Sequence, residues 1–186
     1  MLGKLPKSVE VNGKVLELNT DYRVCLNILQ AFSDPDLTQY DKSIIVIKCL
    51  YKNPEDISSE DFEMCMEKAI WFLNCGDKVN KPQTKKPLYD WEQDEQIIFS
   101  AINKVANKEV RELDYMHFWT FIALFNEIGE SSFSTVVGIR QKKSRGKKLE
   151  DYEREFYRNN KDMVDLKKKY TQEEQEEINS ILEILG

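Results

Sequence analysis

His117 is the only histidine in the sequence, and histidine is a common general base and metal ligand near neutral pH. Apart from Asp114 and neighbours on its own predicted helix, no Cys, Asp or Glu lies at the spacing of a ligand set around it. We therefore interpret His117 as a surface or partly buried helix residue without a chemical role.

Two acidic clusters have the residue types of paired catalytic carboxylates or Mg²⁺ ligands. The first opens a predicted helix, where the helix dipole favours acidic residues: Asp90, Glu92, Asp94 and Glu95. The second lies on exposed positions of the last predicted helix: Glu173, Glu174, Glu176 and Glu177. Since the dipole explains the first cluster and a solvated face the second, neither predicts a catalytic or metal site.

Motifs of the common catalytic and nucleotide-binding sites are absent. The sequence has no P-loop, no G-x-G-x-x-G and no H-E-x-x-H, and its one histidine supports no independent Ser-His-Asp arrangement. The four cysteines, at positions 25, 49, 65 and 75, form no C-x-x-C, so we expect reduced and mostly buried thiols. We therefore predict a protein that is not an enzyme and uses no cofactor or metal.

The strongest charge feature is a basic segment at residues 140–148. It contains six cations and no acidic residue: Arg140, Lys142, Lys143, Arg145, Lys147 and Lys148. Because the whole chain carries a formal net charge of −6, the remainder is strongly acidic and would repel a phosphate backbone. We interpret the segment as a basic loop and do not expect nucleic-acid binding.

The elements that position these residues are mainly helical, since the chain has only seven glycines and five prolines. At the N-terminus, however, Asn12 and Gly13 supply the positive φ angles of a type I′ turn between two alternating strands. The predicted register places four apolar residues on one face, which must pack on helices. These residues are Val9, Val11, Leu16 and Leu18.

Three helices are predicted after this hairpin, at about residues 20–32, 39–51 and 58–76. The β-branched run at 44–47 also suits a strand, but length and flanking residues favour a helix. We therefore divide the chain into a hairpin-plus-three-helix half at 1–76, a linker or long loop at 77–88, and an all-helical half at 89–186. The two halves can still pack as one domain. The predicted fold class is mainly α, an N-terminal β-hairpin followed by a multi-helix bundle.

The second half is predicted to begin with an amphipathic helix capped by Asp90, followed by an apolar helix capped by Asp114. The apolar helix is too short and too interrupted to cross a membrane, and no signal peptide is recognisable. The last helix, capped by Thr171, carries an apolar seam that docks on the body or binds another chain. The seam comprises Ile178, Ile181, Leu182 and Leu185.

Several segments resemble a bacteriophage family called gp fifteen. They are WFLNCG at 71–76, YDWEQD at 89–94, FSTVVGIRQKK at 133–143, GKKL at 146–149, EFYRNNK at 155–161 and VDLK at 164–167. The resemblance covers about residues 9–170 and contains no catalytic motif. It implies a protein of the tail module of long-tailed phages and prophages of Gram-positive bacteria, encoded beside the tape-measure protein.

That gene position resembles the position of tail assembly chaperones, which coat the tape-measure protein while tube subunits polymerise around it. The resemblance therefore implies a non-enzymatic chaperone in the bacterial host cytoplasm during assembly. A structural tail or connector component retained in the virion is the alternative. The implied partners are the tape-measure protein or other tail proteins, with a homo-oligomer also open. The expected partner surface is Arg140, Lys142, Lys143, Arg145, Lys147, Lys148, Ile178, Ile181, Leu182 and Leu185.

Overall fold

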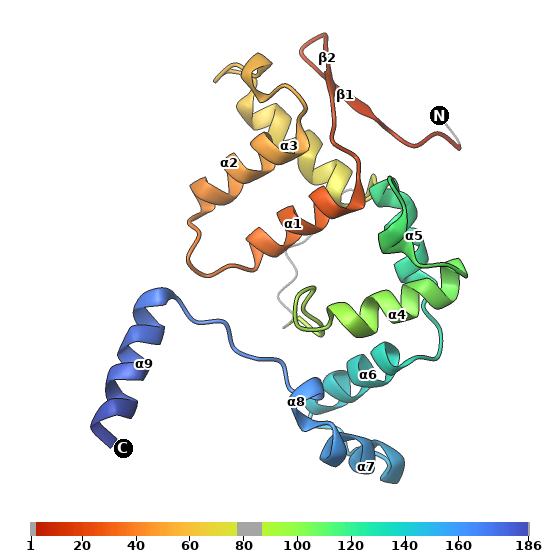
Figure 1. Ribbon diagram of the computed structural model, residues 1–186. Helices are drawn as coiled ribbons and strands as arrows, with labels where there is room; N and C mark the ends of the chain where they lie inside the picture. The colour runs from red at the N-terminus through yellow and green to blue at the C-terminus, as the bar shows by residue number, and fades with distance from the viewer. Residues whose placement is uncertain (1–2, 78–86, 186) are drawn as a thin grey trace.

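The computed structural model describes residues 3–77 and 87–185, with side chains described as far as Asn179. Within these ranges the chain is mainly helical behind an N-terminal β-hairpin, which confirms the predicted fold class (Figure 1). Of the predicted linker at 77–88, residues 78–86 lie outside the described residues.

The hairpin joins β1 (Ser8–Val11) to β2 (Lys14–Glu17). Asn12 and Gly13 have φ angles of 48° and 77°, as the predicted turn requires. Val15 on the outer face is 70% exposed, whereas all four residues of the predicted apolar face are buried. The predicted register is therefore confirmed.

Three helices follow in the first half: α1 (Tyr22–Phe32), α2 (Gln39–Leu50) and α3 (Phe62–Leu73). The β-branched run lies inside α2 and is helical. A capping box between Thr38 and Asp41 begins this helix. A 3₁₀ turn, η1 (Pro54–Asp56), connects α2 to α3.

The second half continues through a 3₁₀ turn and six helices within the described ranges. They are α4 (Glu95–Ala106), η2 (Val110–Glu112), α5 (Phe118–Asn126), α6 (Ser132–Ser144), α7 (Asp151–Asn159), α8 (Lys161–Val164) and α9 (Gln172–Leu185). The helix predicted to begin after Asp90 thus begins at Glu95. Asp90 Oδ1 accepts hydrogen bonds from the N–H groups of Glu92 and Gln93, which close a separate turn before α4.

His117, rather than Asp114, caps α5. Its Nδ1 accepts a hydrogen bond from the N–H of Trp119 at 3.1 Å, so Nε2 carries the proton and donates to the carbonyl of Pro6 at 2.8 Å. The side chain is 3% exposed, and this burial lowers the pKa of His117. The neutral ring is therefore a structural cap that joins the N-terminal segment to α5.

One hydrophobic core contains residues from both sides of the predicted linker. The ring of Tyr22 in α1 stacks on Phe121 in α5, with centroids 4.5 Å apart. The backbone of Asp21 also forms an antiparallel bridge with His117. Trp119 Nε1 donates to the carbonyl of Phe72 at 2.8 Å, which adds a contact between α5 and α3.

Helices α6, α7 and α8 pack around a smaller cluster of Val136, Ile139 and Val164 (Figure 1). An extended segment then leads to α9, which stands apart from the other helices. No helix in the described ranges is long and apolar enough to cross a membrane. The predicted seam residues Ile181, Leu182 and Leu185 have side chains outside the described residues.

Candidate functional site

The predicted basic loop at 140–148 is helical in its first part, which corrects the prediction. α6 extends to Ser144, so three of the six cations lie on its last turns: Arg140, Lys142 and Lys143. A capping box between Ser131 and Ser134 begins this helix, and its buried face continues from Ile139 to Arg140, the first residue of the basic segment. Only residues 145–148 form the turn that follows.

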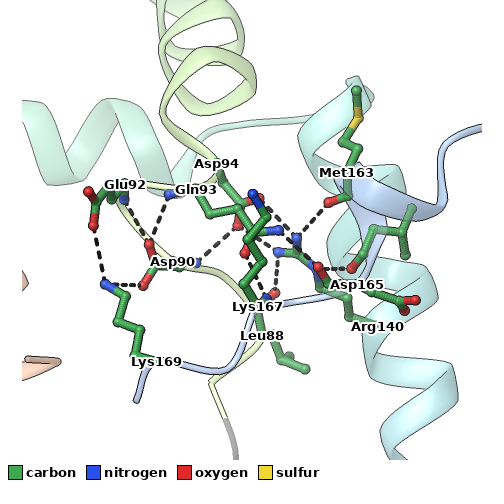
Figure 2. A network of polar contacts seen from close by, with 11 residues as sticks. Leu88, Asp90, Glu92, Gln93, Asp94, Arg140, Met163, Asp165, Lys167 and Lys169 are labelled. Carbon is green, nitrogen blue, oxygen red and sulfur yellow. Dashed lines mark hydrogen bonds and ion pairs between the residues drawn. The ribbon is translucent and has the colours of Figure 1, made fainter. Parts of the chain in front are cut away.

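Arg140 is buried and lies at the centre of a polar network (Figure 2). Its Nη1 and Nη2 donate to the two carboxylate oxygens of Asp94 in a bidentate pair, at 2.6 and 2.9 Å. Its other N–H groups donate to three backbone carbonyls, those of Leu88 at 3.1 Å, Met163 at 2.9 Å and Val164 at 2.6 Å. All five donors of the guanidinium group therefore have an acceptor.

Asp94 is even more deeply buried than Arg140, with 1% of its side chain exposed. It also accepts a hydrogen bond from the N–H of Asp90 at 3.0 Å. A buried ion pair is favourable only when its remaining polar groups are satisfied, which holds for both partners here. Arg140 thus joins α6 to the start of α4 and the end of α8. Arg140 was included in the predicted partner surface, but its side chain is inaccessible and is therefore not available to a partner.

Residues 165–171, which we call the strap, run from α8 to α9 and are held by side chains of residues 90–93. Gln93 donates from Nε2 to the carbonyl of Asp165 and accepts the N–H of Lys167 at Oε1, both at 2.9 Å (Figure 2). Lys169 Nζ lies 2.9 Å from Asp90 and 3.4 Å from Glu92. These contacts recur at every second residue, as expected for extended backbone.

Lys142 and Lys143 are paired within the chain. Lys142 Nζ lies 2.7 Å from Glu153 in α7, and this hydrogen bond raises the pKa of Lys142 and lowers the pKa of Glu153. Lys143 Nζ lies 2.5 Å from Asp165 and sits over the ring of Tyr157. Both lysines therefore hold α6 against α7 and the strap, and are less available to a partner than predicted.

The remaining three cations form what we call the basic turn: Arg145, Lys147 and Lys148. All three are exposed, and none of their side chains pairs with a carboxylate among the described residues. Gly146 between them has a φ of 64°, which lets the chain turn after α6. This turn is the part of the predicted basic surface that is open to a partner.

A groove of about 760 Å³ runs beside the strap. Its apolar walls include Leu29 from α1, Leu88 and Trp91 from the segment before α4, and Leu166 from the strap. Three charged residues also line it: Asp90 and Lys169, which pair with each other, and Lys167, which is exposed. The strap thus forms one wall of the groove, and the Arg140 network holds that wall in place.

The described residues hold no group of three His, Cys, Asp or Glu side chains that could bind a metal ion. The four cysteines are free thiols, and Cys25 and Cys65 are buried. Burial raises the pKa of Cys75 to about 11, so its thiol is protonated at neutral pH. The thiols therefore have the character of core residues.

Asp94 and Gln93 are the functional residues that the sequence interpretation missed. The helix dipole explains an acidic residue at position 94, but Asp94 lies three residues after Trp91 and four before Ile98, on the same apolar stripe. Arg140 likewise follows Phe133 and neighbouring apolar residues at helical spacing. A carboxylate and a guanidinium on apolar stripes were the signal for a buried pair. Gln93 lies in the capping-box position three residues after Asp90, but nothing in the local sequence marks it as a partner of the strap.

A family model described as Bacteriophage Gp15 protein matches residues 1–166. The matched region contains Arg140, Asp94 and the carbonyl acceptors of the network, whereas α9 lies beyond it. Comparisons with curated proteins and with solved structures gave no match. Since the matched region makes up most of the 186 residues, the chain belongs to the bacteriophage Gp15 protein family.

Proposed function

We propose that this protein is a non-enzymatic chaperone that binds the phage tape-measure protein during tail assembly. As a member of the bacteriophage Gp15 protein family, the chain is a phage structural or assembly protein. The tape-measure partner is the finer part of the proposal, and it comes from the resemblance to tail-module proteins. Binding would take place in the bacterial host cytoplasm before the tube closes.

The basic turn is the observation that carries the proposal. Arg145, Lys147 and Lys148 are exposed cations on a chain with a net charge of −6, and no described carboxylate neutralises their side chains. Such a local reversal of charge steers an acidic partner to one face of the protein and fixes its orientation. We infer that acidic residues of the tape-measure protein contact this turn.

The test is co-expression of the tagged protein with the tape-measure protein encoded beside it. We expect the two proteins to copurify and the tape-measure protein to become soluble only in the presence of its partner. A triple charge reversal, R145E/K147E/K148E, should reduce capture at least tenfold at low salt. The matched control is K4E/K48E/K108E, which reverses three exposed lysines elsewhere and should bind like the wild type.

Failure of the wild-type proteins to associate would contradict the chaperone proposal. Equal capture by the wild type and R145E/K147E/K148E, at both low and moderate salt, would show that the basic turn does not bind the tape-measure protein. Mass spectrometry of purified virions then separates the two candidate roles. A chaperone is absent from the finished particle, whereas a structural tail or connector component is present in stoichiometric amount.

A further inference from the structure

We propose that two copies of this chain exchange their α9 helices, each α9 binding in the groove beside the strap of the other copy. The proposal concerns self-association and does not depend on the tape-measure partner. It rests on three features of the molecule: the chemistry of the groove, the chemistry of α9, and the position at which α9 leaves the body.

The groove suits an amphipathic helix with acidic flanks. Leu29, Leu88, Trp91 and Leu166 are only partly buried, so the groove leaves apolar side chains open to water. Covering such a surface is favourable because it removes apolar area from water. Lys167 at the edge is exposed, and it adds a preference for a negatively charged occupant.

α9 has the complementary composition. Its sequence contains five glutamates and no basic residue, and Glu173 and Glu177 are exposed one helical turn apart. Its apolar residues recur at the i, i+3, i+4, i+7 spacing that places them on one face. Its 14 residues make a helix about 21 Å long, at about 1.5 Å per residue.

The position of α9 favours exchange. Leu166, Lys167 and Lys169 of the strap line the groove, and only Tyr170 and Thr171 separate Lys169 from the first residue of α9. The N–H of Gln172 donates to Asp36 Oδ1 at 2.9 Å, yet α9 then stands apart from its own body (Figure 1). A two-fold axis that brings two grooves face to face therefore places the start of each α9 beside the groove of the other copy. Such reciprocal exchange closes a dimer with two identical contacts.

The experiment is sedimentation equilibrium of the full chain at several protein concentrations, at low and at high salt. We expect a dimer at low salt whose dissociation constant rises with ionic strength. K167E and E173K/E177K should each raise the dissociation constant at least tenfold, because like charges then meet at both contacts. K48E, which reverses an exposed lysine of α2 outside the groove, should leave it unchanged.

An equimolar mixture of K167E and E173K/E177K gives the decisive result. In the mixed dimer, Glu at position 167 of one copy meets Lys at positions 173 and 177 of the other. At the second contact, the native Lys167 meets the native Glu173 and Glu177. Both contacts are attractive, so the affinity should return to the wild-type value. A wild-type chain that stays monomeric at all concentrations would overturn the proposal, whether α9 is free or folds onto its own groove. A dimer that survives the charge reversals, or a mixture that is not rescued, would also overturn it. Circular dichroism checks that each variant is folded.

This test is separate from the test of the tape-measure role. R145E/K147E/K148E should dimerise like the wild type while losing the tape-measure protein. K167E should lose the dimer, whatever its effect on the tape-measure protein. Loss of both properties in R145E/K147E/K148E would place the dimer contact at the basic turn and contradict the exchange of α9.

Discussion

Tyr22 and Phe121 join α1 to α5 by stacked rings, whereas Arg140 joins α6 to the start of α4, the segment before it and α8 by five hydrogen bonds. The aromatic contact depends on buried area and shape, and it has no preferred partner atom. The Arg140 contact depends on a fixed number of donors and acceptors in fixed directions. Both contacts are buried and join segments that are far apart in the sequence, but they depend on different interactions.

The difference teaches how each region responds to change. An apolar core tolerates substitutions that keep volume and loses stability in proportion to the atoms removed. A buried ion pair causes a large loss of stability when a single partner is removed, because the other partner then stays charged and unpaired. The strap, which depends on the polar region, should therefore detach as a unit while the aromatic core remains folded.

Asp94→Ala should produce the largest effect. It leaves the buried Arg140 without a counter-charge, and we expect the free energy of unfolding to fall by about 3–5 kcal/mol. The comparison in the hydrophobic core is Ile102 of α4, which is fully buried, and Ile102→Val should cost about 0.5–1.5 kcal/mol. Urea denaturation of both variants measures the difference. Losses of similar size in the two variants would contradict the expected difference between the ion pair and the hydrophobic core.

The double variant Arg140→Met/Asp94→Leu tests whether an apolar pair can replace the network. Replacing a buried ion pair in this way is often neutral, but here Arg140 also serves the carbonyls of Leu88, Met163 and Val164. Only the Val164 contact is fully buried, since the Leu88 and Met163 contacts lie partly open to solvent. A buried carbonyl left without a donor costs about 1–3 kcal/mol, so we expect the double variant to stay at least about 1 kcal/mol below the wild type. Wild-type stability in urea denaturation would show that these carbonyl contacts are dispensable.

Gln93→Ala removes the two hydrogen bonds that hold the strap backbone. At about 0.5–1.5 kcal/mol for each bond, we expect the strap to be weakened by roughly 1–3 kcal/mol. The N–H of Lys167, which donates to Gln93, should then exchange with solvent faster by the corresponding factor. Hydrogen exchange followed by NMR measures this rate. An unchanged rate at Lys167 would exclude Gln93 as an anchor of the strap.

His117→Asn should affect stability in a pH-dependent way. Asn keeps a capping acceptor but loses the bond to Pro6, so we expect a loss of about 1 kcal/mol at pH 8. Burial lowers the pKa of His117 below 6.5, so the unfolded chain binds more protons there and the wild type loses stability as pH falls below about 6.5. The stability gap between wild type and variant should therefore narrow between pH 7 and 5. A constant gap in denaturation measurements would contradict a neutral, buried His117.

Lys169→Gln should have the smallest effect. Its ion pairs with Asp90 and Glu92 lie partly in solvent, where such pairs contribute about 0–1 kcal/mol. We expect hydrogen exchange at Lys167 to change less than in Gln93→Ala, and the remaining difference to vanish at high salt. A larger effect from Lys169→Gln than from Gln93→Ala would make the strap an electrostatic contact instead.

The hairpin and the first three helices were predictable because their signals are local. Asn12 and Gly13 set the turn, and caps and breaker residues mark the helix ends to within a few residues. The predicted helix starts after Asp90 and Asp114 were wrong, because Asp90 closes a separate turn before α4 and His117 caps α5 in place of Asp114. The sequence has no local feature that distinguishes these alternatives.

The network was not predictable to the same degree because its partners are far apart along the chain. Asp94 and Arg140 are separated by 46 residues, and each has an ordinary explanation within its own segment. Their positions on apolar stripes were visible, yet only the packing of α4 against α6 shows that the stripes meet. For the same reason, the basic segment looked like one surface, although Arg140 is buried and only the basic turn is open.

Native-state hydrogen exchange of the wild type and Asp94→Ala tests the central claim most directly. We expect Lys167 to be protected in the wild type and to lose protection in Asp94→Ala. The amides of α1 and α5 should remain protected in both proteins, because the aromatic core does not depend on the ion pair. Parallel loss of protection in α1, α5 and the strap would contradict the claim, as would a Lys167 amide that exchanges freely in the wild type.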